Sequence, residues 1–387
     1  MRVFLDHAST TTLRPEAKAA LVSALELTGN PSSVHSSGQS TRALVEDARD
    51  QVAQAAGCNR SEVVFTSGGT EANNQAIKGL FWAAQKPLII SSVLEHHAVI
   101  DPILWLAENQ GAQVHWLQSS RAGEVDLAEL AEVLEKNQGK VSFVSLMLAN
   151  NETGVITDII AVTELAGKYG VPVHCDAVAA FGNLPIDFSG SGLATMAISG
   201  HKVGAPIGVG ALLVRRDLTL SPLVHGGTQE RSLRSGTLSY SLIASFGAAC
   251  QAATNDLLER EARLSEMRDD LESRVLAAIP EAIVTVSGSR RLPHNAHFLF
   301  PGAQSDNLLF LLDQAGISAS AGSACTAGVL APSHVLIGMG IAPELADCSI
   351  RVSLGHDSTQ SDIDSFVEAI ASAYPVAVRE GANQKAI

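Results

Sequence analysis

The sequence has few cysteines, no paired metal-ligand motif and no long apolar run, and each shortage excludes a class of protein. Its 387 residues include five cysteines, an odd number with no C-x-x-C pair, which argues against a disulfide framework or a zinc knuckle. The histidines show no paired spacing such as H-E-x-x-H, so a metal site is not expected. We therefore expect reduced thiols and no bound metal.

Positive charge is also scarce. Lys and Arg number 26 against 40 Asp and Glu, which gives a formal net charge of −14. Nucleic acids and anionic membranes repel such a chain, so neither is an expected partner. The apolar run LVSALELTG is too short to span a bilayer, and the N-terminus MRVFLDHAS lacks the apolar core of a signal peptide. These features favour a cytoplasmic protein.

What the chain does contain is an alternation of short apolar strands with amphipathic segments. Its length favours two domains. The strand candidates lie between about residues 40 and 235 and read EVVFTS, PLIISSV, QVHWL, VSFVSLM, VPVHCD, ATMAIS and GALLVRR. Because helical patterns such as LAELAEVLEKN separate several of them, the pattern predicts an α/β domain with a mainly parallel seven-stranded sheet.

The C-terminal third predicts a second, smaller domain. One long helical stretch is expected from about Tyr240 to Ile279, interrupted only by Gly247. The strands AIVTVSG, AHFLF and SIRVSLG and a helix near DNLLFLLDQAG follow it, as expected for a compact α+β unit. We expect an N-terminal segment over 1–15 that packs near the active site, a large domain over 16–255, and a small domain over 256–387.

Two reactive side chains follow successive strands of the large domain. Asp176 ends VPVHCD, and Lys202 follows ATMAIS in the run SGHKVGAPIGVG. An aspartate after a strand is more often a turn or a helix cap, but ligands of such sheets bind beyond the carboxyl ends of the strands. A lysine and an aspartate at neighbouring strand ends suit pyridoxal 5′-phosphate (PLP), which needs a Schiff-base lysine and a carboxylate for its ring nitrogen.

A phosphate cradle is expected where VVFTSGGTEANN passes from a strand into a helix. Free backbone N–H groups and the helix dipole meet there at Gly69 and Thr70. A glycine pair before a helix is mostly just a turn, but Ser199 and His201 could converge on the same anion. His96 and Asn151 also follow strands, where an imidazole can stack on a ring or move protons and an amide can bind a carboxylate or a ring oxygen.

Together these motifs resemble the NifS/IscS-type cysteine desulfurases, in the class V aminotransferase group of fold-type I PLP enzymes. The resemblance runs nearly end to end through LDHASTTTLRPEA, SGGTEANN, LEHHAV, ANNETGV, CDAVAAFG, SGHKVGAPIGVGAL, HGGTQERSLRSGT, SAGSACTAG and SIRVSLG. It implies the fold-type I architecture, a homodimer and PLP as the cofactor. SAGSACTAG further places the chain with the long-loop G-S-A-C subgroup.

The resemblance also implies roles for individual residues. Lys202 would form the Schiff base, Asp176 would pair with the pyridinium nitrogen, and His96 would stack on the ring as an acid/base. The residues that would bind the cofactor, including Thr237 from the second subunit, are Gly69, Thr70, Asn151, Ser199, His201 and Thr237. The substrate L-cysteine would contact Asn30, Asn151 and Arg351.

Cys325 is the nucleophile that the resemblance implies. It lies among small residues in SASAGSACTAG, a composition that indicates a mobile loop. Its thiolate would attack the sulfur of L-cysteine, leaving L-alanine and a persulfide that passes to acceptor proteins such as an iron–sulfur scaffold or a tRNA-thiolation enzyme. A selenocysteine lyase, a C–S lyase of the same fold, and a weakly active scaffold for sulfur assembly remain alternatives.

One position departs from the family. The family usually has D-A-x-Q after the strand, and its glutamine contacts the phenolic oxygen of the cofactor, whereas this chain reads Asp176-Ala177-Val178-Ala179. A methyl group cannot donate that hydrogen bond. We expect PLP to bind but imine protonation and rate to be altered.

Overall fold

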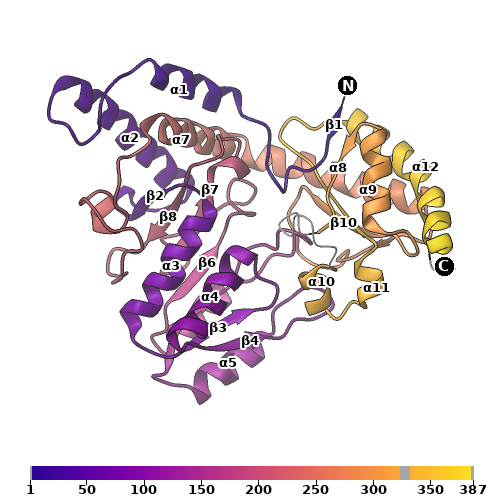
Figure 1. Cartoon of the computed structure of the whole chain (residues 1–387), viewed down its shortest axis with the longest axis horizontal. Coiled ribbons are helices and arrows are strands. Elements are labelled where there is room, and N and C mark those ends of the chain that lie inside the picture. Colours follow the sequence, from indigo (N-terminus) through magenta and orange to yellow (C-terminus); the bar gives the residue numbers. More distant parts are fainter. Residues whose placement is uncertain (1, 323–331, 385–387) are drawn as a thin grey trace.

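The large domain is built around a seven-stranded sheet, shown in a computed structural model that describes residues 2–322 and 332–384 (Figure 1). The strand order is β2-β8-β7-β6-β5-β3-β4. Strand β8 runs antiparallel to both of its neighbours, β2 and β7. The other pairs in the sheet are parallel. The strands are β2 (Val63–Thr66), β3 (Leu88–Ser92), β4 (Gln113–Leu117), β5 (Val141–Ser145), β6 (Val173–Asp176), β7 (Thr195–Ser199) and β8 (Gly210–Val214).

Helices cover both faces of this sheet. Alternate residues of one strand enter different cores: Val63 and Phe65 of β2 pack in one cluster, and Val64 packs in the other. The first cluster includes residues of α2, α5, α6 and α7, and the second includes residues of α3 and α4. The helices are α1 (Pro15–Leu25), α2 (Ser36–Ala55), α3 (Gly69–Ala84), α4 (His97–Gln110), α5 (Leu127–Lys136), α6 (Ile159–Gly167) and α7 (Tyr240–Asn255).

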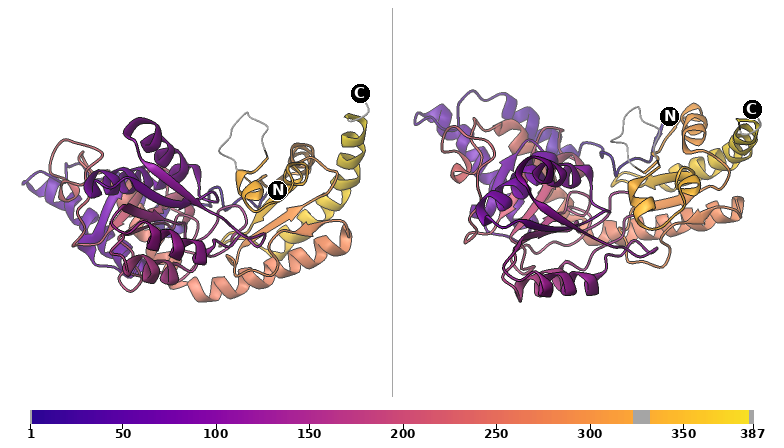
Figure 2. Two further views of the ribbon diagram at one scale, coloured as in Figure 1. Left: turned by 90° about the horizontal axis from the view of Figure 1, so that it is seen from below. Right: turned by 60° about the horizontal axis from the view of Figure 1, so that its bottom comes forward.

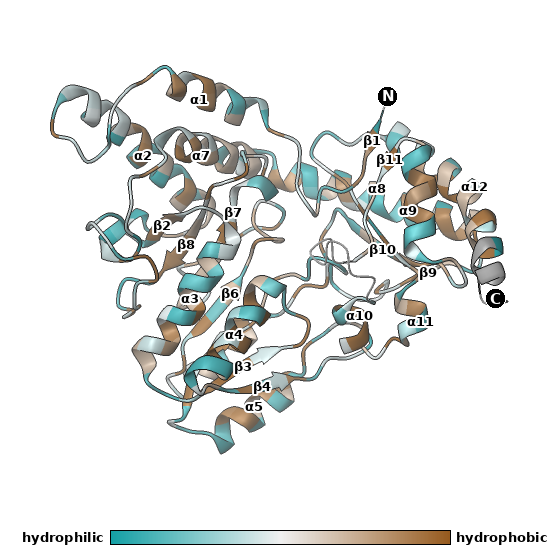
Figure 3. Ribbon diagram, viewed as in Figure 1, coloured by the Kyte–Doolittle hydropathy of each residue, from teal (hydrophilic) through white to brown (hydrophobic). Residues whose placement is uncertain are grey.

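Burial on both faces explains why the strands read as continuous apolar runs. In Figure 3, β2 and β8 are brown, whereas the visible side of α3 is largely teal, as expected for a helix with one face in solvent. Short 3-10 helices occur at Arg60–Glu62, Gly200–Lys202 and Glu230–Ser232. The second of these contains Lys202 and follows β7 directly, so a buried strand positions the backbone of the lysine.

The small domain contains an antiparallel sheet of order β12-β10-β9. Leu271, Phe298 and Phe366 are buried in its core. Val3–Phe4 (β1) pairs in parallel with Ile317–Ser318 (β11), so the N-terminus lies against this domain (Figure 1). The other elements are α8 (Leu257–Ala278), β9 (Ile283–Val284), β10 (Asn295–Leu299), α9 (Ser305–Gln314), α10 (His334–Gly338), α11 (Pro343–Ala346), β12 (Ser349–Ser353) and α12 (Gln360–Gln384).

The expected single helix from Tyr240 to Ile279 is two helices, divided at Asp256. The buried Arg260 donates to the carbonyls of Ala253 and Gly182 and pairs with Asp256, and Arg14 also bonds to Asp256. These contacts bind the joint to the large domain. Figure 2 shows α8 leaving this joint and running along the small domain.

No helix within residues 2–322 and 332–384 is long and apolar enough to cross a membrane. The cysteines in those ranges, Cys58, Cys175, Cys250 and Cys348, are all free thiols.

Candidate active site

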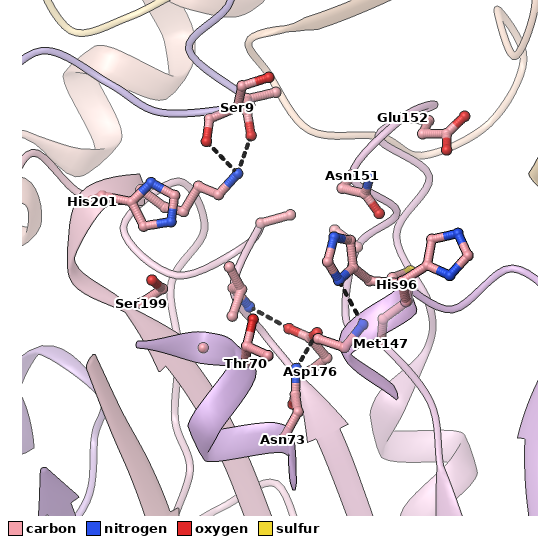
Figure 4. A pocket seen from close by; sticks show the side chains of 18 of the residues that line it. Ser9, Thr70, Asn73, His96, Met147, Asn151, Glu152, Asp176, Ser199 and His201 are labelled. Carbon is pink, nitrogen blue, oxygen red and sulfur yellow. Dashed lines mark hydrogen bonds between the residues drawn. The ribbon is translucent and has the colours of Figure 1, made fainter. Parts of the chain in front are cut away.

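A cavity of about 260 Å³ lies where the large domain, the small domain and the N-terminal segment meet (Figure 4). It opens beyond the carboxyl ends of β6 and β7, the edge at which ligands of parallel sheets bind. Ala8 and Ser9 of the N-terminal segment and Gly322 before β12 also line it. The residues predicted from the sequence that it brings together are Gly69, Thr70, His96, Asn151, Asp176, Ser199, His201, Lys202 and Arg351.

Asp176 ends β6 and is only 5% exposed. Its Oδ2 accepts from Asn73 Nδ2 at 2.7 Å, and its Oδ1 accepts from the backbone N–H of Val178 at 2.9 Å. Two N–H donors stabilise the ionised carboxylate and fix its orientation. The arrangement suits a partner for a protonated ring nitrogen.

Lys202 follows β7 in the short 3-10 helix, and its Nζ points toward the N-terminal segment. The ammonium donates to the backbone carbonyls of Ala8 and, at 2.8 Å, Ser9. Figure 4 shows these two bonds above the ring of His201. Lys202 therefore lies in the same cavity as Asp176, as the spacing of the two strand ends predicts.

His96 occupies the N-cap of α4, and its Nδ1 accepts from the backbone N–H of Ala98 at 3.0 Å. Burial lowers the pKa of the imidazole, although the charge of Asp176 opposes this effect. The ring is therefore mainly neutral at neutral pH. Because Nδ1 is an acceptor, the proton of the neutral ring lies on Nε2.

The start of α3 forms a concave surface of backbone. A Cβ atom on Gly69 would lie 2.6 Å from Val178 Cγ2, so only glycine leaves room there. His201 has a pKa lowered to about 4 by burial and by the charge of Lys202, and its buried Nδ1 has no hydrogen-bond partner within the described part of the chain. A helix N-terminus, Thr70, Ser199 and an unsatisfied imidazole in one cavity fit the phosphate of PLP.

Arg351 on β12 joins the small domain to the site and is 2% exposed. Its guanidinium donates to the carbonyl of Asn151 at 2.8 Å, to Ser9 Oγ at 2.7 Å and to Asp6 Oδ1 at 2.9 Å. Its Nε is buried without a partner among the described residues. A guanidinium held this way is oriented to receive a carboxylate.

Two buried carboxyl groups near the cavity were not predicted. Burial raises the pKa of Glu152, which bonds to Ser333 Oγ, and raises that of Glu95 well above its usual value. Glu95 Oε1 accepts from the backbone N–H of Met147 at 2.6 Å. Burial therefore disfavours the charged form of both carboxyl groups. Acidic residues in turns usually face solvent, so the burial of these two could not be predicted from the sequence.

Asn73 was also missed as a site residue. It lies in SGGTEANN one helical turn after Gly69, so its side chain returns to the face of α3 that lines the cavity. That spacing was the available signal. The importance of the residue depends on its contact with Asp176, which the sequence does not reveal.

Three predicted site residues do not line the cavity in the described chain. Asn30 is exposed in the connection between α1 and α2, and Thr237 is exposed before α7. Cys325 lies outside the described residues, and the flanking Gly322 lines the cavity.

Ala179 lines the cavity where the family glutamine is expected. Its carbonyl accepts from Asn183 Nδ2 at 3.2 Å. Beside it lies a space of about 10 Å³ bounded in part by Lys202, His294 and Asn295. His294 Nδ1 and Asn295 Oδ1 are buried there without partners among the described residues.

Comparisons with known proteins identify the family and the fold of this chain. Residues 3–366 match the aminotransferase class-V family, and the chain belongs to that family. It is 46% identical over 376 residues to an IscS-like cysteine desulfurase of Mycobacterium tuberculosis, an alignment that covers 96% of this chain and 95% of the relative. It is 38% identical to the cysteine desulfurase NifS of Azotobacter vinelandii over 371 residues, 95% of this chain and 91% of that protein.

Solved structures agree with these sequence relatives. A NifS-like protein from Rickettsia africae superimposes with a TM-score of 0.88 at 34% identity, covering 97% of this chain and 100% of that one. The resemblance to cysteine desulfurases, the α/β fold class and the cysteine desulfurase function predicted from the sequence are confirmed.

Proposed function

We propose that the cavity between the two domains converts L-cysteine to L-alanine with the help of PLP and delivers the sulfur to Cys325. The observation that carries this proposal is the convergence of Lys202, Asp176 and the start of α3 on one cavity. Curated relatives named cysteine desulfurases align along nearly the whole chain and support the same reaction.

PLP would be held at three points. Lys202 would bind its aldehyde carbon, Asp176 its ring nitrogen, and Gly69, Thr70, Ser199 and His201 its phosphate. When bound, the cofactor supplies an electron-accepting ring next to the α-carbon of the substrate. Burial keeps His201 neutral, so its ring can donate one hydrogen bond to the phosphate without adding charge.

The substrate would be oriented by its carboxylate. Arg351 is fixed by Asn151, Ser9 and Asp6, and its position in the cavity lets it receive this group. The side chain of Asn151 also lines the cavity, and we assign it a role in the same contact. The amine of Lys202, when it is not bound to the cofactor, would take the α-proton of the substrate. His96 would first act as a hydrogen-bond donor through Nε2.

Sulfur transfer balances as one exchange of bonds. The thiolate of Cys325 attacks the substrate sulfur, an S–S bond forms, and the C–S bond breaks. The carbon keeps the bonding electron pair and is later protonated, so that it is reduced while the sulfur is oxidised to a persulfide. L-cysteine and one thiol thus give L-alanine and one persulfide, without an external oxidant or reductant.

Three of the other thiols are poorly suited to this step. Burial raises the pKa of Cys58 to about 12 and raises those of Cys175 and Cys250 well above the usual thiol value. A thiol in that state is a weak nucleophile at neutral pH, because the thiolate is the reactive form. This supports the choice of Cys325.

The working form that we propose is a homodimer in the cytoplasm. Thr237 and Asn30 are exposed in a single chain, and a second copy would allow Thr237 of the partner subunit to complete the phosphate contacts. The persulfide would then pass to acceptor proteins, among them an iron–sulfur scaffold.

The test is to incubate the protein with PLP and L-cysteine, measure alanine, and locate the persulfide by mass spectrometry. We expect alanine from the wild type and from Cys58→Ser, persulfide on Cys325, and neither product from Cys325→Ala. Pyruvate, ammonia and sulfide formed from L-cysteine by Cys325→Ala would favour a C–S lyase. Alanine formed from selenocysteine but not from L-cysteine, with a thiol reductant present, would favour a selenocysteine lyase. A wild-type protein that acquires no PLP chromophore would favour the scaffold.

A further inference from the structure

A series of buried hydrogen bonds connects Asp176 to Thr195 through the side chains of Asn73 and His174. Asn73 Nδ2 donates to Asp176 Oδ2 at 2.7 Å, and Asn73 Oδ1 lies 3.0 Å from His174 Nε2. His174 Nδ1 in turn lies 2.9 Å from Thr195 Oγ1. The side chains belong to α3, β6 and β7, so one network links the helix of the phosphate cradle with both strands that carry the reactive residues.

These side chains are shielded from solvent. Asn73 is 1% exposed, and His174 and Thr195 are 0% exposed. A buried polar group needs its partners, since one left without a hydrogen bond destabilises the fold. Because each of these side chains has a hydrogen-bond partner, the network has few alternative side-chain conformations.

The direction of each bond follows from the charge of the histidine. Burial lowers the pKa of His174 to about 3, so the ring is neutral and carries a single N–H. Asn73 donates its amide to Asp176, and its oxygen must therefore accept. The proton of His174 then lies on Nε2, and its Nδ1 accepts from the hydroxyl of Thr195.

The result is that an N–H group donates to each carboxylate oxygen of Asp176. Asn73 Nδ2–H and the backbone N–H of Val178 both point at its carboxylate. Glu95 also lies close enough for the two charges to interact, and burial and the charge of Asp176 raise its pKa well above the usual value. His96 and Lys202 lie in the same cavity, which is also lined by the titratable or charged residues His97, Glu152, His201, His334 and Arg351. A carboxylate among N–H donors is stabilised as the anion.

We propose that Asn73 and His174 are positioning residues that hold the carboxylate of Asp176 aimed at the ring nitrogen of bound PLP. The inference rests on the proposed function, in which Asp176 is the partner of that nitrogen. It adds that the orientation of Asp176 is set by His174 through the amide of Asn73.

The sharpest test is Asn73→Asp, because this change keeps the size of the side chain and places a second carboxyl in contact with Asp176. Two carboxyl groups at that distance share a proton, so the variant places a shared proton where the wild type has an amide N–H. We expect a new ionisation between about pH 5 and 8 in the absorption spectrum of bound PLP, and an affinity for PLP at least about tenfold weaker. Both readouts are independent of turnover.

The matched control is Asn109→Asp, which makes the same change of charge at an exposed side chain bonded only to the carbonyl of Trp105 in the described structure. It should titrate like the wild type. A second pair tests the histidine: His174→Phe removes the donor to Asn73 and should weaken PLP binding, whereas His174→Gln offers an amide N–H and should restore it at least in part. A variant that melts at the wild-type temperature but shows these changes has not merely lost its fold.

The outcomes separate this inference from the proposed function. If Asn73→Asp and His174→Phe leave both the titration and the affinity for PLP unchanged while Asp176→Asn alters them, the positioning role is wrong and the role of Asp176 survives. If Asp176→Asn also changes neither readout, the assignment of Asp176 itself is wrong.

Discussion

Gly69 lies at the first position of α3, where the addition of one methyl group should weaken PLP binding. A Cβ atom there would lie 2.6 Å from Val178 Cγ2 and 3.4 Å from Ser199 Cβ. Two carbon atoms are in normal contact at about 3.5 to 4.0 Å, so one side chain must move. Both neighbours belong to the cavity, and we expect the strain to be relieved at its surface.

The size of the effect follows from the cost of overpacking. An extra methyl group in a packed region costs about 1 to 3 kcal/mol. If that cost falls on the cofactor-bound form, Gly69→Ala should bind PLP about 5- to 150-fold more weakly. Val178→Ala removes the clashing Cγ2 and leaves the Val178 Cβ at 3.7 Å, an ordinary contact. The two substitutions together should therefore cost less than the sum of their separate effects.

The assay is absorbance titration of the unliganded protein with PLP for the wild type, each single variant and the double variant. Gly167→Ala is the matched control, since a Cβ on that helical glycine meets nothing within 4 Å. Unchanged affinity in Gly69→Ala, or strictly additive losses in the double variant, would show that Gly69 does not shape the cofactor site.

Three further predictions concern the cofactor, the substrate and acid stability. Ala179→Gln should change the absorption spectrum of bound PLP and the rate of alanine formation, because it supplies the hydrogen-bond donor that a methyl group lacks; if it changes neither, our interpretation of Ala179 is wrong. Arg351→Lys should raise KM for L-cysteine about tenfold and affect kcat less, because an ammonium cannot form the same set of directed bonds; steady-state kinetics will show whether kcat falls instead. Burial lowers the pKa values of His174, His294 and His297 from 6.5 to about 3. The unfolded chain takes up these protons first, so each histidine removes about 1.4 kcal/mol of stability per pH unit as pH falls below 6.5, and none above it. Urea unfolding at a series of pH values gives the free energy of unfolding at each pH. Below pH 6.5 this free energy should change less steeply with pH in His297→Gln than in the wild type, and an equal dependence on pH would contradict the prediction.

Most strands of the large domain could be predicted from the sequence because both of their faces are buried, although the edge strand β4 is more exposed. Runs such as VVFT in β2 and GALLV in β8 are apolar throughout, which distinguishes them from amphipathic helices such as α5. Asp176 ends β6 and Lys202 follows β7, so these two parallel strands place both residues at one edge of the sheet. The core of the candidate site thus follows from local pattern alone.

Other features depend on contacts between distant residues and could not be predicted in this way. The division between α7 and α8 relies on Arg260 and Arg14, which meet Asp256 only in the folded chain. The pairing of β1 with β11 joins two-residue strands that are too short to show a periodicity. The burial of Glu152 is likewise a property of the packing around it, since its own sequence neighbours are polar.

The most direct test of the central claim is reduction of the PLP-loaded protein with borohydride, followed by peptide mapping. The account predicts a single pyridoxyl adduct on Lys202, abolished in Lys202→Ala. An adduct on another lysine, or no adduct in a protein that has taken up PLP, would contradict it.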